Sequence, residues 1–216
     1  MMIDGPRLSP SSGAPARKLV VFLHGYGADG NDLIDLGRMF APVLPDAAFV
    51  SPNAPDPCDQ SPMGRQWFPL AMGDPHLYWQ GVEHGAPALT AFLDAELDRL
   101  GLTDRDLALV GFSQGTMMAL HVGLRRPGGV AGIVGYSGLL AGPEHLADPG
   151  VRKVPILLVH GEADPIIPVM ALHASVAALG AAGINTEWHV SPGLAHGIDE
   201  AGLRLGADFL RAVLAG

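Results

Sequence analysis

Five short runs of apolar residues, none of which alternates with polar positions, constrain the fold of this chain more than any other feature. The runs are Leu19–Leu23, Ala47–Val50, Leu107–Val110, Val130–Val134 and Ile156–Val159. Continuous apolar runs of this length are typical of strands buried on both faces, as in parallel sheets covered by helices. A sixth run, Thr186–Val190, alternates more and is expected near a sheet edge.

Segments with helical periodicity separate these runs. Apolar residues recur at helical spacing from Val82 to Leu97, over Val169–Leu179, and from Ile198 to Val213. Hydrophobic residues make up 48% of the chain and charged residues 16%, which fits a compact globular protein. The alternation predicts one α/β domain over residues 1–216, with a mostly parallel sheet and helices on both faces.

Composition excludes several classes of function. The net charge of −9 argues against nucleic acid as a partner. Cys58 is the single cysteine, so no intramolecular disulfide is possible, which suits a reducing compartment. Residues 1–16 have no apolar segment of the kind found in signal peptides or anchors, and no run is long enough to span a bilayer. We therefore expect a cytoplasmic protein. No metal-ligand spacing is present, so we expect neither a metal nor a cofactor.

The segment 51–81 does not fit the alternation. It carries six prolines and shows no convincing helical period. Its large apolar side chains are those of Trp67, Phe68, Leu70, Met72, Tyr78 and Trp79. Long loops within a compact domain are usually functional or disordered, and this apolar content argues against disorder. Two interpretations stay open, and both can hold: a packed loop that closes the core, or a wall near an active site.

The motif Gly111-Phe112-Ser113-Gln114-Gly115 joins a predicted strand to a predicted helix. A serine between glycines at such a turn is the arrangement of a nucleophile elbow, in which the hydroxyl points outward from a sharp bend. The following helix directs its first N–H groups at any anion formed there. Ser113 is therefore the candidate nucleophile.

An acid and a histidine follow in the order that such sites require. Ligands of open α/β sheets bind at the carboxyl ends of the strands. Asp164 follows one predicted strand in a loop that Pro165 and Pro168 stiffen, with Glu162 as the rival acid. His196 lies in a glycine-flanked loop before the last helix. The order Ser113, Asp164, His196 is that of α/β hydrolases, with His196 as general base and Asp164 as the group that orients it.

Two N–H donors are needed for the oxyanion of an acyl-transfer reaction. The N–H of Gln114, which follows the nucleophile, is one candidate by the geometry of the elbow. The second is expected from the glycine-rich loop over residues 23–30, which follows the first long apolar run.

Four motifs together resemble the bacterial carboxylesterase and acyl-protein thioesterase group, also called the phospholipase/carboxylesterase family. They are Leu23-His24-Gly25-Tyr26-Gly27-Ala28-Asp29, Gly111-Phe112-Ser113-Gln114-Gly115, Gly161-Glu162-Ala163-Asp164-Pro165 and Gly193-Leu194-Ala195-His196-Gly197. The similarity extends from about Gly5 to the end of the chain. The resemblance implies a single-domain α/β-hydrolase fold, a triad of Ser113, Asp164 and His196, and an oxyanion hole made by the N–H groups of Leu23 and Gln114.

The resemblance also implies residues that contact substrate. Arg65-Gln66-Trp67-Phe68 resembles the family's tryptophan motif, which lines the acyl pocket, and Ile166 falls where the family places a pocket residue beside the acid. One departure is Thr116, since many members carry glycine at that position.

The leading prediction is a serine hydrolase that cleaves small-molecule carboxylic esters of short to medium acyl chain through an acyl-enzyme on Ser113. Alternatives with the same triad are an acyl-protein thioesterase and a lysophospholipase. A dienelactone hydrolase is disfavoured because that group uses cysteine at the elbow. An alternative of another class is a non-catalytic binding protein of the same fold, but such proteins generally lack a triad member. The sequence carries no signal for the oligomeric state.

Overall fold

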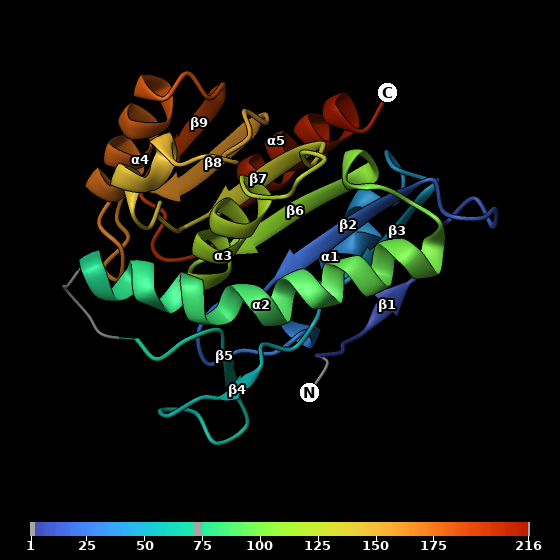
Figure 1. Cartoon of the computed structure of the whole chain (residues 1–216), viewed down its shortest axis with the longest axis horizontal. Helices are drawn as coiled ribbons and strands as arrows, with labels where there is room; N and C mark the ends of the chain where they lie inside the picture. Colours follow the sequence, from blue (N-terminus) through green and yellow to red (C-terminus); the bar gives the residue numbers. More distant parts are fainter. Residues whose placement is uncertain (1–2, 71–74, 216) are drawn as a thin grey trace.

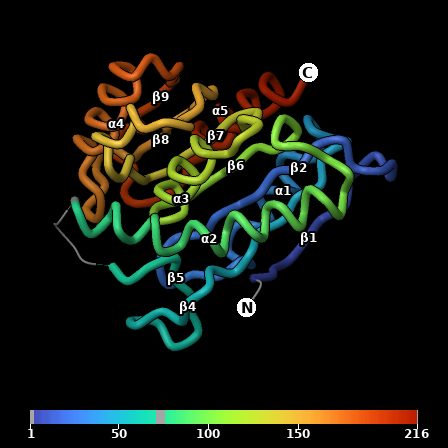
Figure 2. Tube along the Cα trace, in the orientation of Figure 1, coloured from blue at the N-terminus to red at the C-terminus, as the bar shows by residue number. Residues whose placement is uncertain are grey.

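The computed structural model describes residues 3–70 and 75–215. Over these residues, seven strands form one sheet in the order β1-β3-β2-β6-β7-β8-β9, and only β1 runs antiparallel to its neighbour. The strands of this sheet are β1 (Arg7–Leu8), β2 (Lys18–Leu23), β3 (Ala47–Val50), β6 (Leu107–Phe112), β7 (Gly132–Tyr136), β8 (Ile156–Gly161) and β9 (Thr186–Ser191). Figure 2 traces the chain from the blue strands at one side of the sheet to the orange β9 at the other.

Five α-helices among the described residues cover the two faces of the sheet (Figure 1). They are α1 (Asn31–Phe40), α2 (Pro75–Leu100), α3 (Gln114–Gly123), α4 (Met170–Ala181) and α5 (Glu200–Val213). Helices α2, α3 and α4 pack on one face, and α1 and α5 pack on the other. Two short 3₁₀ helices, η1 (Asp104–Asp106) and η2 (Pro143–Ala147), complete the connections. The mostly parallel α/β sheet predicted from the apolar runs is confirmed.

Adjacent residues of the buried strands contribute to different hydrophobic cores. In β2, Val21 and Leu23 belong to the core under α2, α3 and α4, whereas Val20 and Phe22 belong to the core under α1 and α5. Because side chains alternate across a strand, a sheet with helices on both faces needs apolar residues at every position. This requirement explains the continuous runs in the sequence.

Two strands lie at the edges of the sheet. The alternating run Thr186–Val190 corresponds to β9, which is an edge strand as expected. The other edge strand, β1, has only two residues and was not predicted, since two residues show no periodicity. Helix α1 was also missed; its first turn follows directly from the glycine-rich loop that the sequence assigns to the oxyanion site.

Strand β7 lies two residues later than the predicted run Val130–Val134. The strand contains glycines, which interrupt the apolar run in the sequence. Close packing leaves no room for a side chain at these positions. A Cβ at Gly132 would lie 2.9 Å from Val213 Cγ2, and one at Gly135 would lie 2.5 Å from Thr116 Cγ2. Side chains of neighbouring helices and strands therefore fill the space next to these glycines.

The predicted loop 51–81 is shorter than expected, because α2 begins at Pro75 rather than near Val82. The first turns of α2 lack a clear period, since Gly81 packs against the ring of Phe68 with no room for a Cβ. Residues 71–74, including Met72, lie outside the described part of the chain. The remaining segment contains a two-stranded hairpin, β4 (Asp56–Pro57) and β5 (Arg65–Gln66).

Candidate active site

Ser113 occupies a strained turn between β6 and α3. Its backbone has φ 54° and ψ −116°, and Ser113 is one of two non-glycine residues with positive φ in the described chain. Such a conformation costs a non-glycine residue on the order of 1–3 kcal/mol and persists only where surrounding structure imposes it. The N–H of Ser113 donates to Tyr136 O of β7, at 2.9 Å. The elbow predicted from the motif is therefore present.

Both motif glycines are required by close packing. A Cβ at Gly111 would collide with the carbonyl of Gly115, and a Cβ at Gly115 would collide with the carbonyl of Leu23. Thr116, where the family often has glycine, is fully buried, and its Oγ1 lies 2.9 Å from the carbonyls of both Gly111 and Tyr136. The threonine therefore ties β6 to β7 at the base of the turn without disturbing it.

Asp164 and His196 are hydrogen-bonded, with 2.7 Å between Asp164 Oδ2 and His196 Nδ1. The other carboxylate oxygen accepts from the N–H groups of Ile166 and Ile167, at 2.8 and 2.9 Å. Burial alone raises the pKa of Asp164, but these hydrogen bonds outweigh it and hold the pKa below its usual range. An ionised Asp164 accepts from Nδ1–H, so Nε2 is the nitrogen that can accept a proton in the neutral imidazole of His196.

Contacts across the carboxyl edge of the sheet bring the histidine loop to the elbow. Ser137, the other residue with positive φ, donates from Oγ to Gly197 O at 2.9 Å. The ring centroids of Phe112 and His196 are 5.0 Å apart. Among the described residues, Ser113 makes no side-chain hydrogen bond to His196; nucleophile–base contacts are often longer in ligand-free structures. The three residues of the predicted triad come from adjacent loops of one site region.

The two predicted oxyanion donors lie in different settings. Gln114 is the first residue of α3, where helix N–H groups have no intrahelical partner. Leu23 lies inside β2, is fully buried and pairs in register with Gly111. The loop beyond Leu23 approaches Ser113, because a Cβ at Gly25 would lie 3.4 Å from Ser113 Cβ.

The two predicted substrate contacts differ in exposure. Ile166 is 51% exposed beside Asp164, as a residue at the mouth of a site would be. Trp67 is 0% exposed, and its indole N–H donates to His24 O at 3.0 Å. A tryptophan buried in this way fixes a backbone carbonyl through its indole N–H, and its ring has no exposed face that a ligand could contact. Trp67, which the resemblance assigns to the wall of the acyl pocket, is therefore enclosed by protein in this structure.

Sequence reasoning missed the contribution of several side chains. The Gln114 amide is buried and bonded to the backbone at Trp67 and Phe68. His160 donates from Nε2 to Ile167 O at 2.8 Å and lies 3.3 Å from Asp164 Oδ2, so it braces the loop of the acid. The position of His160, directly after the predicted strand and four residues before Asp164, was the available signal, but only side-chain geometry gives the hydrogen-bond partner.

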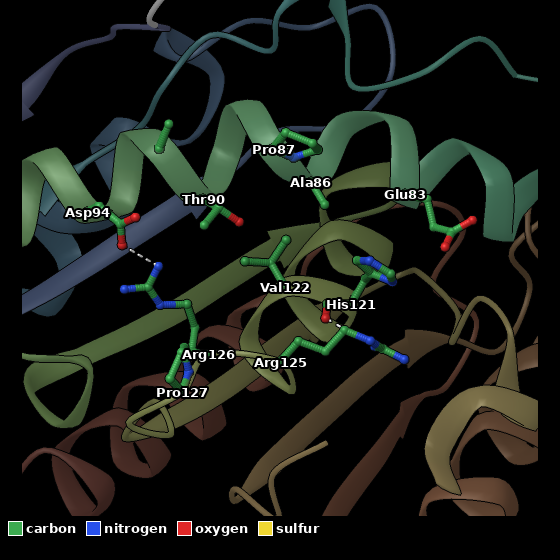
Figure 3. A pocket seen from close by; sticks show the side chains of 11 residues that line it. Glu83, Ala86, Pro87, Thr90, Asp94, His121, Val122, Arg125, Arg126 and Pro127 are labelled. Carbon is green, nitrogen blue, oxygen red and sulfur yellow. Dashed lines mark hydrogen bonds and ion pairs between the residues drawn. The ribbon is translucent and has the colours of Figure 1, made fainter. Parts of the chain in front are cut away.

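A groove of about 510 Å³ between α2 and α3 lies apart from these residues (Figure 3). Its walls include Ala86, Pro87, Val122 and His121, and none of the triad residues lines it. His121 packs edge-on against Trp79, with 5.0 Å between ring centroids. Burial, with smaller contributions from Arg125 and His145, lowers the pKa of His121 to about 4. His121 is therefore a packing residue that is neutral at pH 7.

The buried His121 predicts acid sensitivity of the fold. Its pKa is about 4 when folded, against about 6.5 for an ordinary histidine, so the unfolded chain binds the extra proton between these values. The contribution of His121 to stability is complete above about pH 6.5 and is lost as the pH falls toward 4. We expect His121→Leu to show a smaller drop in melting temperature between pH 7 and 4.5 than the wild type. The exposed His84→Leu serves as the control, and an equal drop in all three proteins would contradict the prediction.

Among the described residues, no group of three or more His, Cys, Asp or Glu side chains is arranged to hold a metal ion. Nor does any described helix have the length and apolar character that crossing a membrane requires.

The parallel sheet, the strained serine after its central strand and the acid–histidine pair on the following loops define an α/β-hydrolase fold. The family described as Phospholipase/Carboxylesterase matches residues 10–214, and the chain belongs to this family. It therefore belongs with the esterases and acyl-protein thioesterases, a group of serine hydrolases.

Similar proteins carry the names of both activities. Esterase YpfH of Escherichia coli is 29% identical over 197 residues, covering 91% of this chain and 83% of the relative. Acyl-protein thioesterase 1 of Saccharomyces cerevisiae is 29% identical over 197 residues, covering 84% of this chain and 86% of the relative. The crystal structure of esterase PE8 superposes with a TM-score of 0.95 at 42% identity, covering 99% of this chain and all of that one.

Proposed function

We propose that this protein hydrolyses carboxylic esters of short to medium acyl chain through an acyl-enzyme on Ser113. The observation that carries the proposal is the strained Ser113 turn, set on the same sheet edge as the Asp164–His196 hydrogen bond. A serine hydroxyl is a poor nucleophile at neutral pH and needs a base to take its proton. An unprotonated Nε2 on His196 supplies that base.

The reaction has two stages. Ser113 Oγ bonds to the ester carbonyl carbon as His196 Nε2 takes its proton, and the tetrahedral oxyanion collapses to the acyl-enzyme as the alcohol leaves with that proton. Water then attacks the acyl carbon, His196 accepts its proton and returns it to Ser113, and the carboxylic acid is released. Asp164 holds the imidazole in place and stabilises its charge in both stages.

The oxyanion donors we propose are the N–H groups of Gln114 and Tyr26. Both N–H groups lie outside the sheet, and neither donates to a protein acceptor among the described residues. The Gly25–Tyr26 peptide lies next to Ser113, as the short separation between a Cβ at Gly25 and Ser113 Cβ indicates. Leu23, expected from the resemblance, is less suited because it lies within the sheet.

The acyl chain is assigned to an apolar cavity of about 220 Å³ beside the site. It is lined by Tyr78, Leu139, Leu140, Ala141, Gly142, Pro143, Ala171, Ala174 and Ser175. The loop that forms one wall begins after β7 and passes next to Ser113, since a Cβ at Gly138 would lie 2.8 Å from Ser113 O. Pockets for drug-sized ligands occupy about 300–1,000 Å³, so this cavity favours a short to medium chain.

Specificity is expected to rise with acyl length and then stop. Each buried CH₂ contributes about 0.8 kcal/mol until the wall of the cavity is reached. Ala171→Phe adds a ring to that cavity and is expected to move the optimum to shorter chains. The measurement is kcat/KM for p-nitrophenyl esters from acetate to palmitate, with the α4 surface variant Ala177→Phe as the matched control. The same profile in all three proteins would move the acyl site elsewhere.

A thioesterase uses the same residues, and the named relatives include both kinds of enzyme. Matched oxygen esters and thioesters of one acyl chain separate the two activities, and we expect the oxygen ester to have the higher kcat/KM. Labelling with a fluorophosphonate separates an enzyme from a binding protein of the same fold. The enzyme is labelled at Ser113, and an unlabelled, folded chain would overturn the proposed function.

A further inference from the structure

A buried set of hydrogen bonds connects the elbow to the segment before α2. Gln114 Oε1 accepts from the N–H of Trp67 at 2.9 Å, and Gln114 Nε2 donates to Phe68 O at 2.8 Å. Gln114 is almost completely buried, as are Trp67 and Phe68. One amide therefore fixes the backbone of two consecutive residues of the segment to the start of α3.

The same segment holds the loop after β2. Trp67 Nε1 donates to His24 O at 3.0 Å, and the two rings lie 5.7 Å apart between centroids. His24 Nε2 accepts from the N–H of Ala54 at 3.0 Å, so the ring proton is on Nδ1. His24 Nδ1 then donates to Gly25 O at 2.8 Å. Burial lowers the pKa of His24, although its bond to Gly25 acts in the opposite direction, which favours this neutral form.

The bond to Gly25 O sets the direction of a catalytic donor. In a trans peptide the carbonyl and the following N–H lie in one plane and point in opposite directions. The imidazole of His24 therefore holds the carbonyl side of the Gly25–Tyr26 peptide and leaves the Tyr26 N–H directed away from that ring. Two successive carbonyl oxygens of this loop, His24 O and Gly25 O, therefore accept hydrogen bonds from buried side chains.

We propose that Gln114, Trp67 and His24 act together as positioning residues, which lock the Tyr26 N–H of one loop to the Gln114 N–H of the elbow as a preformed oxyanion hole. The inference rests on the proposed hydrolase function. It gives Trp67 a role in transition-state stabilisation that does not require contact with substrate. It also gives Gln114 a second role, through its side chain, beside that of its backbone N–H.

The first test is Trp67→Phe, which keeps an aromatic ring and removes the indole N–H. Loss of an oxyanion donor costs about 10²–10³ in kcat, so a donor that is present but loosely held is expected to cost about 10- to 100-fold. KM is expected to change little, because the ester binds before the oxyanion forms. A trifluoromethyl ketone that adds to Ser113 should lose affinity by the same factor as kcat/KM, whereas the matched amide should not.

Gln114→Met is the second test, because it removes the amide while preserving length and apolar bulk. If the hydrogen-bonded residues act as a unit, Gln114→Met should lower kcat and the affinity for the trifluoromethyl ketone, as Trp67→Phe does. Trp188→Phe is the matched control, since Trp188 is 51% exposed on β9 and lies outside the network. Melting temperatures confirm that each compared protein is folded.

The outcomes separate the inference from the function on which it rests. Wild-type kcat and ketone affinity in folded Trp67→Phe and Gln114→Met would overturn the positioning role. A raised KM with unchanged kcat in Trp67→Phe would also overturn it, and would return Trp67 to the acyl pocket. A wild-type protein that neither turns over esters nor reacts with fluorophosphonate would instead overturn the proposed function itself.

Discussion

Ser113→Ala is expected to lower kcat for ester hydrolysis by about 10⁴-fold or more, because removal of a nucleophile disables a triad that acts as a unit. The measurement is steady-state hydrolysis of the preferred p-nitrophenyl ester, together with fluorophosphonate labelling of both proteins. The hydroxyl of Ser113 makes no side-chain hydrogen bond within the described chain, so the melting temperature should change little.

Retention of substantial turnover by Ser113→Ala would assign the nucleophile to another residue. Glu162→Gln is the control for general effects at the site edge. Glu162 was the rival acid in the sequence. Its carboxylate accepts from the N–H of Gly193 at 3.1 Å and takes no part in the hydrogen bond between Asp164 and His196. We expect Glu162→Gln to keep most of the wild-type rate.

Asp164→Asn is expected to cost about 10⁴-fold in kcat, since an amide cannot hold the Nδ1–H tautomer of the imidazole as a carboxylate does. Hydrogen bonds hold the pKa of Asp164 below its usual value despite burial, so the wild-type carboxylate stays ionised over the assay range. The acid limb of kcat/KM should therefore follow one proton, taken up by the base His196. A rate independent of pH between about pH 5 and 8, around the ordinary histidine value, would contradict a histidine base.

The same carboxylate predicts a stability difference at low pH. A carboxyl group with a lowered pKa in the folded state stabilises the fold above its ordinary value of about 3.9, and this contribution is lost as the pH falls through the folded value. Asp164→Asn lacks this titration, so its melting temperature should fall less steeply than that of the wild type below about pH 4. Equal slopes for the two proteins would indicate that Asp164 is not held in this way.

Elements with a strong local signal could be predicted from the sequence. The buried strands were visible because both faces of each are covered, and Ser113 was visible because its turn requires Gly111 and Gly115. The acid and the histidine followed from their order and from their place after a strand. In the structure, Asp164 Oδ2 lies 2.7 Å from His196 Nδ1, within hydrogen-bond distance.

Features that depend on long-range packing were not predictable in the same way. Gly81 and Gly132 interrupt apolar patterns because a neighbouring element fills the space of their side chains, so the start of α2 and the position of β7 were misplaced. The burial of Trp67 beneath the loop after β2 also depends on partners far away in sequence. A motif shows that a tryptophan is present, but not which of its faces is occupied.

The positive φ of Ser113 lowers the stability of the fold at the residue that we propose as the nucleophile. An L-residue at φ 54° is strained, whereas glycine adopts such angles readily. A chain released from selection for activity thus has a one-residue route toward a more relaxed fold, at the cost of the nucleophile that we propose. Under the proposed function, serine at this position is therefore informative about selection, because backbone conformation alone favours its replacement by glycine.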